Sequence, residues 1–252
     1  MAAHTLCRAA VLAATVIALA AGTTARAADP RFPELEYAYP DQSVWTTRID
    51  QRGEPDNPLL RLAAALFDKA GIPWHGRSYP AARVFTNLRD GTAQFSMLVA
   101  SPGLEECCLI GRAPVASTEL RVYRAAATPP IRDAAGLAGK RVVTIRGYSY
   151  GGLLDFLSDA RNGAVNNATV GHQAAFAMLD AGRGDYLLDY TGPAVEVLTG
   201  HPIGGLRFDV LSRLDVHLVL SRSYPEAAAV MARLEAIAAT LDTGAILAAD
   251  GK

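Results

Sequence analysis

A glycine-rich turn at residues 146–152, RGYSYGG, is the segment of this chain best suited to chemistry or to binding. It contains G-x-S-x-G, the pattern in which a serine on a sharp strand-to-helix turn attacks an acyl carbon. Asp189 and His217 then follow Ser149 in the order that α/β-type serine hydrolases use. The same turn also predicts a binding site, because free N–H groups at a helix start and the Ser149 hydroxyl hold an anion or a carbonyl. We favour binding, since a pattern with two fixed glycines often arises by chance.

Asp189 and several aromatic residues are further candidates for ligand contact. Asp189 ends an apolar strand predicted at 186–190, and ligands of α/β sheets bind at that edge. The alternative for Asp189 is a turn residue or a cap for the next helix. Binding pockets have mostly apolar and aromatic walls with a few polar groups. Tyr39, Trp45 and Tyr150 are the candidate aromatic contacts, with core packing as the alternative for each.

Thiol and metal chemistry have little support in the sequence. The adjacent pair Cys107-Cys108 can form a disulfide only through a strained ring, so we favour two small apolar residues beside a strand over that alternative. No second cysteine pair accompanies it, as a zinc site would require. After residue 27, four histidines are scattered without the i, i+4 spacing of a metal site, namely His75, His172, His201 and His217. We therefore expect neither a metal nor a cofactor.

The chain alternates predicted strands and helices, which is the pattern of an α/β fold. The clearest helix starts after Asn57, a capping residue followed by Pro58, and stops at Gly71. Its apolar face comprises Leu59, Leu60, Leu62, Ala63, Leu66 and Phe67. Strands are predicted at 35–39, 74–79, 95–99 and 119–123, with a helix at 80–88.

A second unit is predicted to begin after the loop at 128–130. A strand at 141–145, rich in β-branched residues, runs into the glycine turn. The predicted elements that follow are helices at 153–157, 174–179, 193–198 and 225–241 and strands at 186–190 and 216–220.

The first 27 residues have the three parts of a secretory signal peptide. Arg8 supplies the positive charge, an uncharged apolar stretch spans 9–21, and Ala25 and Ala27 precede the predicted cleavage. The apolar stretch is too short to cross a bilayer, which takes about 20 residues. Cys7 lies before the apolar stretch and cannot be a lipid-attachment cysteine. We expect a mature protein from Ala28, exported to the periplasm and not lipid-anchored.

Charge and length limit the function further. The chain has 24 Lys and Arg against 25 Asp and Glu, which excludes the basic surface of a nucleic-acid-binding protein. The mature length suits one large or two small domains. We expect no fused catalytic or signalling domain after Lys252.

Four stretches follow one another in an informative order. LRDGTAQF at 88–95 has a leucine, an aspartate and a glycine before a strand, and LAGKRVV at 137–143 leads into the RGYSY of the turn. GRGD at 182–185 begins the strand that ends at Asp189, and VHLVLS at 216–221 returns before the closing helix. Together, in order and spacing, they resemble the type II periplasmic solute-binding proteins, especially those that serve polar amino acids.

The resemblance implies a two-lobed α/β fold in which two crossing strands join the lobes and the ligand lies in the cleft between them. One lobe would comprise 28–125 and 211–252, and the other would be an insertion at 126–210. Such proteins close like a hinge around their ligand. In this family a hydroxyl at the position of Ser101 contacts the ligand, and an aspartate at the position of Asp189 binds its ammonium group.

The chain departs from the family at the arginine that pairs with a ligand's α-carboxylate through its planar fork. Glu105 and Glu106 stand at the nearest positions. Either Arg83 or Arg146 would replace the missing cation, or Glu106 would face a cationic ligand; solvated surface residues are the alternative.

The resemblance therefore implies a monomeric solute-binding protein that captures a small polar solute without turning it over. Its partner would be the membrane permease of an ATP-driven (ABC) importer or, alternatively, a membrane sensor. A secreted esterase that uses Ser149 is the enzymatic alternative.

Overall fold

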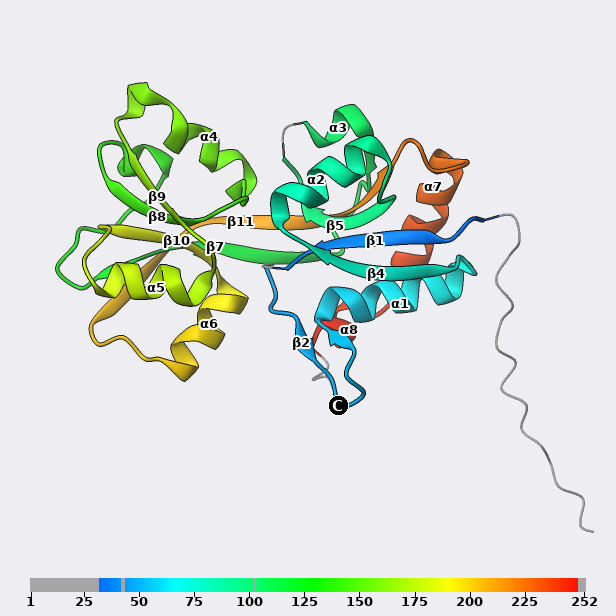
Figure 1. Ribbon diagram of the computed structural model, residues 1–252, viewed down its shortest axis with the longest axis horizontal. Helices are drawn as coiled ribbons and strands as arrows, with labels where there is room; N and C mark the ends of the chain where they lie inside the picture. Colours follow the sequence, from blue (N-terminus) through cyan, green and yellow to red (C-terminus); the bar gives the residue numbers. More distant parts are fainter. Residues whose placement is uncertain (1–31, 42–43, 102, 249–252) are drawn as a thin grey trace, which may run out of the picture.

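Two lobes lie side by side and share one continuous sheet (Figure 1). The computed structural model describes residues 32–41, 44–101 and 103–248, so the signal peptide expected at 1–27 lies outside the described residues. Strand order in the sheet is β4-β1-β5-β11-β7-β10-β8-β9, with β6 also paired to β11. Among the described residues, no helix is long and apolar enough to cross a membrane.

The first lobe is built around the helix that the sequence predicts most clearly. This helix, α1 (Pro58–Ala70), is capped by the Asn57 side chain, which accepts a hydrogen bond of 2.9 Å from the Leu60 N–H, and it ends at Gly71 in the left-handed conformation. The predicted apolar face is buried against the sheet. The other elements of this lobe are β1 (Leu35–Pro40), β4 (Trp74–Tyr79), α2 (Ala81–Asp90), β5 (Phe95–Val99), α3 (Leu104–Cys107), β6 (Cys108–Ile110), α7 (Ala227–Ala238) and α8 (Thr243–Ala248).

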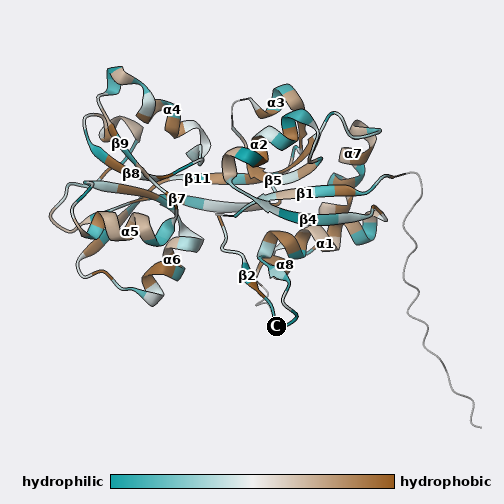
Figure 2. Ribbon diagram, in the orientation of Figure 1, coloured by the Kyte–Doolittle hydropathy of each residue, from teal (hydrophilic) through white to brown (hydrophobic). Residues whose placement is uncertain are grey.

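Helices cover both faces of the sheet in the first lobe, whereas its outer edge strand is open. Helices α2 and α3 lie on one face, and α1 and α8 lie on the other (Figure 1). Figure 2 shows α1 as hydrophobic, whereas β4 is hydrophilic along much of its length. Because β4 is the last strand on this side of the sheet, its polar side chains protect an open edge. A small hairpin, β2 (Arg48–Ile49) and β3 (Pro55–Asp56), extends from the same lobe.

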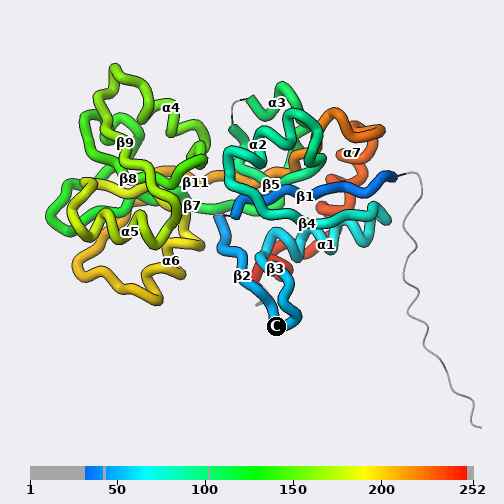
Figure 3. The backbone as a smooth tube through the Cα atoms, in the orientation of Figure 1, coloured from blue at the N-terminus to red at the C-terminus, as the bar shows by residue number. Residues whose placement is uncertain are grey.

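The second lobe packs helices on both faces of its part of the sheet, with α4 on one side and α5 and α6 on the other (Figure 3). Its elements are β8 (Arg141–Ile145), α4 (Leu153–Ser158), β9 (Val165–Thr169), α5 (His172–Asp180), β10 (Tyr186–Tyr190) and α6 (Thr191–Gly200). The sequence analysis did not predict β9. Its sequence, VNNAT, lacks an apolar pattern because it is an edge strand, held by its backbone pairing with β8.

Two strands, β7 (Ala116–Ala125) and β11 (Leu206–Ser221), cross between the lobes as an antiparallel pair. Both are longer than the predicted strands. In the first part of β11, Leu206, Phe208 and Val210 alternate with charged residues, a strand pattern that the prediction at 216–220 did not include. The apolar cores of the two lobes separate inside these strands. Ala116 and Val216 belong to the first core, and Leu120 belongs to the second, with Leu214 packed against it.

An ion pair fixes the far end of these crossing strands. Asp209 on β11 accepts hydrogen bonds from Arg124 at 2.7 and 3.3 Å and from the Ile131 N–H at 3.2 Å. The Arg124 guanidinium is the main cause that holds the pKa of Asp209 below its usual range. A lowered carboxyl pKa adds stability above the pKa of the unfolded chain, about 4, and this stability is lost as the pH falls through the folded pKa.

We therefore expect Asp209→Asn to lower stability at pH 7 and to weaken the loss of stability in acid. Urea unfolding at pH 7 and at several values below pH 4 measures both effects. Asp180→Asn, on the exposed side of α5, is the control. An acid dependence of Asp209→Asn equal to that of the unsubstituted protein would contradict the expectation.

Candidate functional site between the lobes

A small cavity of about 50 Å³ lies where the two lobes meet. The first lobe contributes Pro40, Val44, Ala81, Phe85, Met97, Leu98, Val99 and Val216, and the second contributes Gly147, Tyr148, Ser149 and Tyr190. Apolar and aromatic side chains form most of this lining. The Ser149 and tyrosine hydroxyls are its polar side-chain groups. The cavity can therefore hold an apolar group with one or two hydrogen bonds.

A wider groove of about 330 Å³ continues from this cavity. The two share Phe85, Gly147, Tyr148 and Ser149. The groove is more polar, since its lining also includes Thr86, Arg89, Ser101, Cys107 and Asp155. An apolar inner end and a polar outer end thus meet at the glycine turn.

The lobes are shut against each other around this cavity. A Cβ atom added at Gly147 would lie 3.2 Å from both Ala81 Cβ and Ala82 N of the other lobe. On the hairpin side, a Cβ at Gly192 would lie 2.8 Å from the Val44 carbonyl oxygen. These close approaches show that the two lobes are in direct contact at two places beside the cavity.

The glycine turn places Ser149 and buries Tyr150. Four residues of the turn have positive φ, namely Gly147, Tyr150, Gly151 and Gly152, and this lets the chain reverse within a few residues. Two N–H groups, those of Gly152 and Leu154, donate to the Ser149 carbonyl oxygen and are used within the turn. The Ser149 side chain lines both the cavity and the groove.

Ser101 and Ser149, two residues singled out from the sequence, come together from opposite lobes along the groove. Trp45 is half-buried and lines a separate groove of about 420 Å³ between the hairpin and α6. Arg83 and Arg146 are exposed, and neither lines the cavity or its groove. Instead Arg89, two turns along α2 from Arg83, reaches the groove, and the sequence analysis missed it.

Three other expected contacts point into the protein instead of the cleft. Tyr39 is 3 % exposed and packs in the core of the first lobe. Tyr150 is 2 % exposed, and its hydroxyl accepts a 2.6 Å hydrogen bond from the Ile145 N–H. Asp189 has no exposed surface. In this closed arrangement none of these three side chains lines the cavity or its groove, and ligand contact by them stays a prediction.

Asp189 is occupied by groups of its own lobe. His172 Nδ1 lies 2.8 and 2.9 Å from its two carboxylate oxygens, and the Tyr190 N–H donates to Oδ1 at 2.7 Å. Burial raises the pKa of Asp189, and the hydrogen bond from His172 opposes that rise. Asp189 is not a surface turn residue, because its side chain is fully buried, and it does not cap α6, which has no side-chain cap hydrogen bond.

Tyr148 and Phe85, which line the cleft, and His172, which contacts Tyr148, were not predicted from the sequence. Tyr148 and Phe85 line both the cavity and the groove, and His172 Nε2 lies 3.3 Å from the Tyr148 hydroxyl. Tyr148 could have been predicted because it precedes Ser149 in the turn. No sequence pattern around His172 indicates that it contacts the turn.

The hydrolase alternative requires Ser149, His217 and Asp189 to meet, and they do not. His217 Nδ1 donates to the Gly111 carbonyl oxygen at 2.8 Å in the first lobe. Asp189 instead holds His172. The three residues therefore form no Ser-His-Asp arrangement of the kind that activates a serine.

The segment at 104–108 contains two cysteines and two glutamates, and of these four residues only Cys107 lines the groove. Cys107 and Cys108 are unpaired in this structure, and burial raises the pKa of Cys108 to about 12. Glu105 and Glu106 are exposed and line neither the cavity nor its groove. Among the described residues, no group of three His, Cys, Asp or Glu could hold a metal ion.

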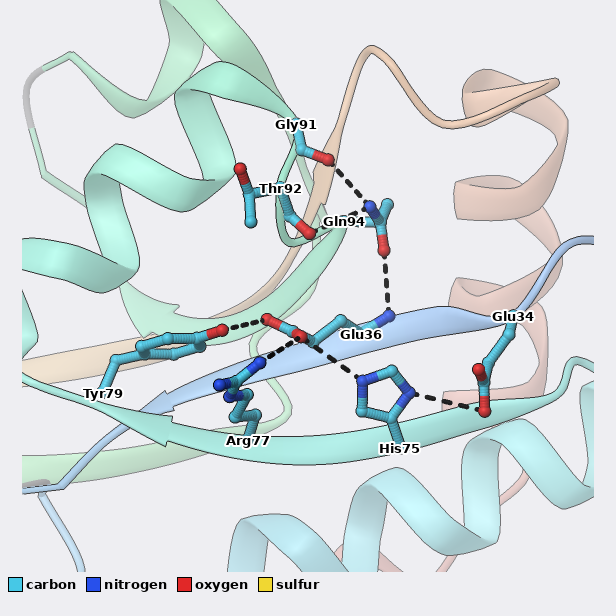
Figure 4. Close-up of polar contacts among 8 residues, drawn as sticks. All are labelled: Glu34, Glu36, His75, Arg77, Tyr79, Gly91, Thr92 and Gln94. Carbon is cyan, nitrogen blue, oxygen red and sulfur yellow. Dashed lines mark hydrogen bonds and ion pairs between the residues drawn. The ribbon is translucent and has the colours of Figure 1, made fainter.

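A second polar cluster lies on the open edge of the first lobe, and Figure 4 shows its contacts. The largely buried Glu36 carboxylate accepts a hydrogen bond from the Tyr79 hydroxyl at 2.8 Å and lies 3.3 Å from His75 Nε2. His75 Nδ1 lies 3.4 Å from Glu34. None of these side chains lines the cavity or the groove between the lobes. The cluster satisfies a buried carboxylate at a sheet edge and is not part of the candidate site.

Comparison with solved structures identifies the fold. A histidine kinase sensor domain with similarity to periplasmic binding proteins has a TM-score of 0.72 and 18% identity, over 86% of this chain and 96% of that one. An ancestral arginine-binding protein bound to arginine has a TM-score of 0.68 and 14% identity, over 84% and 96%. The substrate binding protein of an amino acid ABC transporter has a TM-score of 0.65 and 10% identity, over 85% and 96%. No family model and no curated protein matches the sequence.

The chain therefore has the two-lobed fold of the periplasmic binding proteins, and the predicted fold is confirmed. By their descriptions, these three neighbours are binding or sensor proteins.

Proposed function

We propose that this chain is an exported solute-binding protein, which captures a small solute in the cavity and groove between its lobes and passes it to the permease of an ABC importer. The main support is that residues of both lobes build the cavity jointly. A solute held there touches both lobes and stabilises their closed arrangement. A membrane partner can then distinguish the closed, solute-bound protein from the open, solute-free protein.

The lining of the site supports a solute with one apolar and one polar end. The inner cavity offers aromatic and aliphatic walls with a few hydroxyls. The outer groove offers Ser101, Ser149 and Arg89 to the polar end. The solute is thus less uniformly polar than the sequence resemblance implied.

Transport and export remain parts of this proposal. The similarity to the substrate binding protein of an amino acid ABC transporter supports an importer, and the apolar stretch at 9–21 supports export to the periplasm. Similarity to a histidine kinase sensor domain supports a second candidate, in which the liganded chain acts on a membrane sensor.

A thermal-shift screen of amino acids, amines, small carboxylates and small amides tests the proposed binding. A solute at about one hundred times its dissociation constant stabilises the protein by about 2.7 kcal/mol. For a chain of this size, we expect the melting temperature to rise by roughly 5–10 °C. No stabilisation by any solute of a broad library would overturn the proposal.

Two further measurements separate the roles. If the chain serves an importer, deleting its gene abolishes uptake of the stabilising solute; if it serves a sensor, uptake persists and the transcriptional response to the solute is lost. Assay of a chromogenic ester tests the esterase, and turnover that Ser149→Ala abolishes would replace binding by hydrolysis as the function.

A further inference from the structure

Three side chains connect the interior of the second lobe to the cleft. Asp189 is fully buried, and its carboxylate contacts His172 Nδ1 at 2.8 and 2.9 Å. On the other side of the imidazole, Nε2 lies 3.3 Å from the Tyr148 hydroxyl. Tyr148 lines both the cavity and the groove, whereas His172 lines neither. The imidazole therefore acts on the cleft only through Tyr148.

The carboxylate determines which imidazole nitrogen carries the proton. An ionised carboxylate only accepts hydrogen bonds, so Nδ1 of His172 donates to Asp189. The Nε2 of a neutral imidazole is then an acceptor, and the Tyr148 hydroxyl donates to it. Burial raises the pKa of Tyr148 well above its usual value, with the charge of Asp189 as a further cause, so the hydroxyl keeps its proton. Its oxygen then offers only lone pairs to the cleft.

Protonation of His172 reverses this arrangement. Both nitrogens of an imidazolium donate, so Nε2–H donates to the Tyr148 oxygen. The Tyr148 O–H is released and can donate into the cleft. One proton bound behind the cleft thus changes its hydroxyl from an acceptor to a donor.

We propose that His172 and Asp189 set the direction of the hydrogen bond that Tyr148 makes with the solute. The cleft then selects an uncharged N–H or O–H donor on the solute while His172 is neutral, and it loses this selection when His172 is protonated. The inference rests on the proposed binding of a solute between the lobes.

Aromatic rings and a few ionisable groups surround the contact between His172 and the Tyr148 hydroxyl. The ring of Tyr148 packs against those of Tyr150, Tyr190 and His172, with centroid distances of 5.7, 5.5 and 5.9 Å. The ionisable groups that face the pair from the packed elements are Asp189 and Tyr190 of β10, Tyr150 of the turn, Asp41 after β1, and Glu196 and His201 across the groove between α5 and α6. His172 is the basic group in direct contact with the Tyr148 hydroxyl.

Nitrogen-15 NMR of histidine-labelled, solute-free protein tests the hydrogen-bonding direction. In its neutral form we expect His172 to carry its proton on Nδ1. Tyr148→Phe should shift the Nε2 signal, and Asp189→Asn should remove the preference for the Nδ1 tautomer. The signals of exposed His201 serve as the internal control. A neutral His172 protonated on Nε2 would overturn the proposal, whether or not any solute binds.

Butyramide and pentan-2-one, which have the same shape, test the selection itself. Only the amide carries donors, so while the NMR shows His172 neutral we expect it to bind more tightly by about 2- to 10-fold, the range that one hydrogen bond supplies. The preference should shrink under any condition in which the NMR shows both nitrogens protonated, and it should disappear in Tyr148→Phe. Tyr224→Phe, a buried tyrosine whose hydroxyl donates to Pro33 O in the first lobe, should keep it.

The two experiments separate this inference from the proposed function. A preference for the amide that is the same in both protonation states of His172, as the NMR identifies them, would overturn the role of His172 while leaving solute binding intact. If neither probe binds, the failure falls on the proposed function, and the NMR tautomer still decides the direction of the hydrogen bond.

Discussion

Replacing Gly192 by valine is expected to hold the two lobes apart and to weaken solute binding by about tenfold or more, because apparent affinity falls with the fraction of protein in the competent state. Gly192 is the second residue of α6, and an added Cβ would lie 2.8 Å from the Val44 carbonyl oxygen of the other lobe. That oxygen belongs to the backbone, so it cannot move aside as a flexible side chain would. The φ of Gly192 lies outside the left-handed region, so the substitution obstructs closure without straining its own helix.

Small-angle X-ray scattering and the thermal shift with a stabilising solute measure the two consequences. The radius of gyration of Gly192→Val should exceed that of the unsubstituted protein with solute present. Gly200→Val at the other end of α6 is the matched control, because an added Cβ there meets nothing within 4 Å. Equal radii and equal affinities for the two variants would show that closure does not need this contact.

Replacing Asp189 by alanine is expected to lower the free energy of unfolding by about 2–6 kcal/mol. The substitution leaves two buried donors without an acceptor, His172 Nδ1–H and the Tyr190 N–H. Each unsatisfied buried group costs about 1–3 kcal/mol. The loss is large because Asp189 is fully buried, so water cannot replace the carboxylate without opening the lobe.

Asp185→Ala is the matched control, four residues earlier at the start of the same strand. Asp185 pairs with Arg141 near the surface, where their side chains are 34% and 50% exposed. Surface pairs contribute about 0–1 kcal/mol. Urea unfolding at pH 7 compares the two variants, and equal losses of stability would mean that the Asp189 pair is not a buried structural contact.

Local patterns in the sequence predicted most of the longer helices and strands of the fold. The cap at Asn57, the proline after it and Gly71 determine the bounds of α1, because they act within one or two helical turns. Alternation of apolar strands and helices predicted the α/β class, and the glycine turn placed Ser149 at the end of β8. The strand β9 was not predicted because VNNAT has no apolar pattern, and the first part of β11 was not predicted although Leu206, Phe208 and Val210 alternate with charged residues.

The candidate site was harder to predict, because strand ends do not reveal which way a side chain points. Asp189 lies near the carboxyl end of β10, where ligands of α/β sheets bind. However, α5 packs against β10, and His172 contacts the Asp189 carboxylate. The same limit applies to Tyr150, which turns into the core because a positive φ reverses its direction. On α2, the packing of the lobes exposes Arg83 and brings Arg89 to the groove.

The sequence by itself determined the α/β class, the bounds of the main helix and the positions of Ser101 and Ser149 at the ends of their strands, because these depend on neighbours along the chain. Only the tertiary structure decided that the two serines share one groove, that the cores divide within β7 and β11, and that His172 lies between Asp189 and the Tyr148 hydroxyl. These pairings join residues from different elements or lobes. They depend on which faces the packed helices cover and on how the lobes close, and neither is encoded in local spacing.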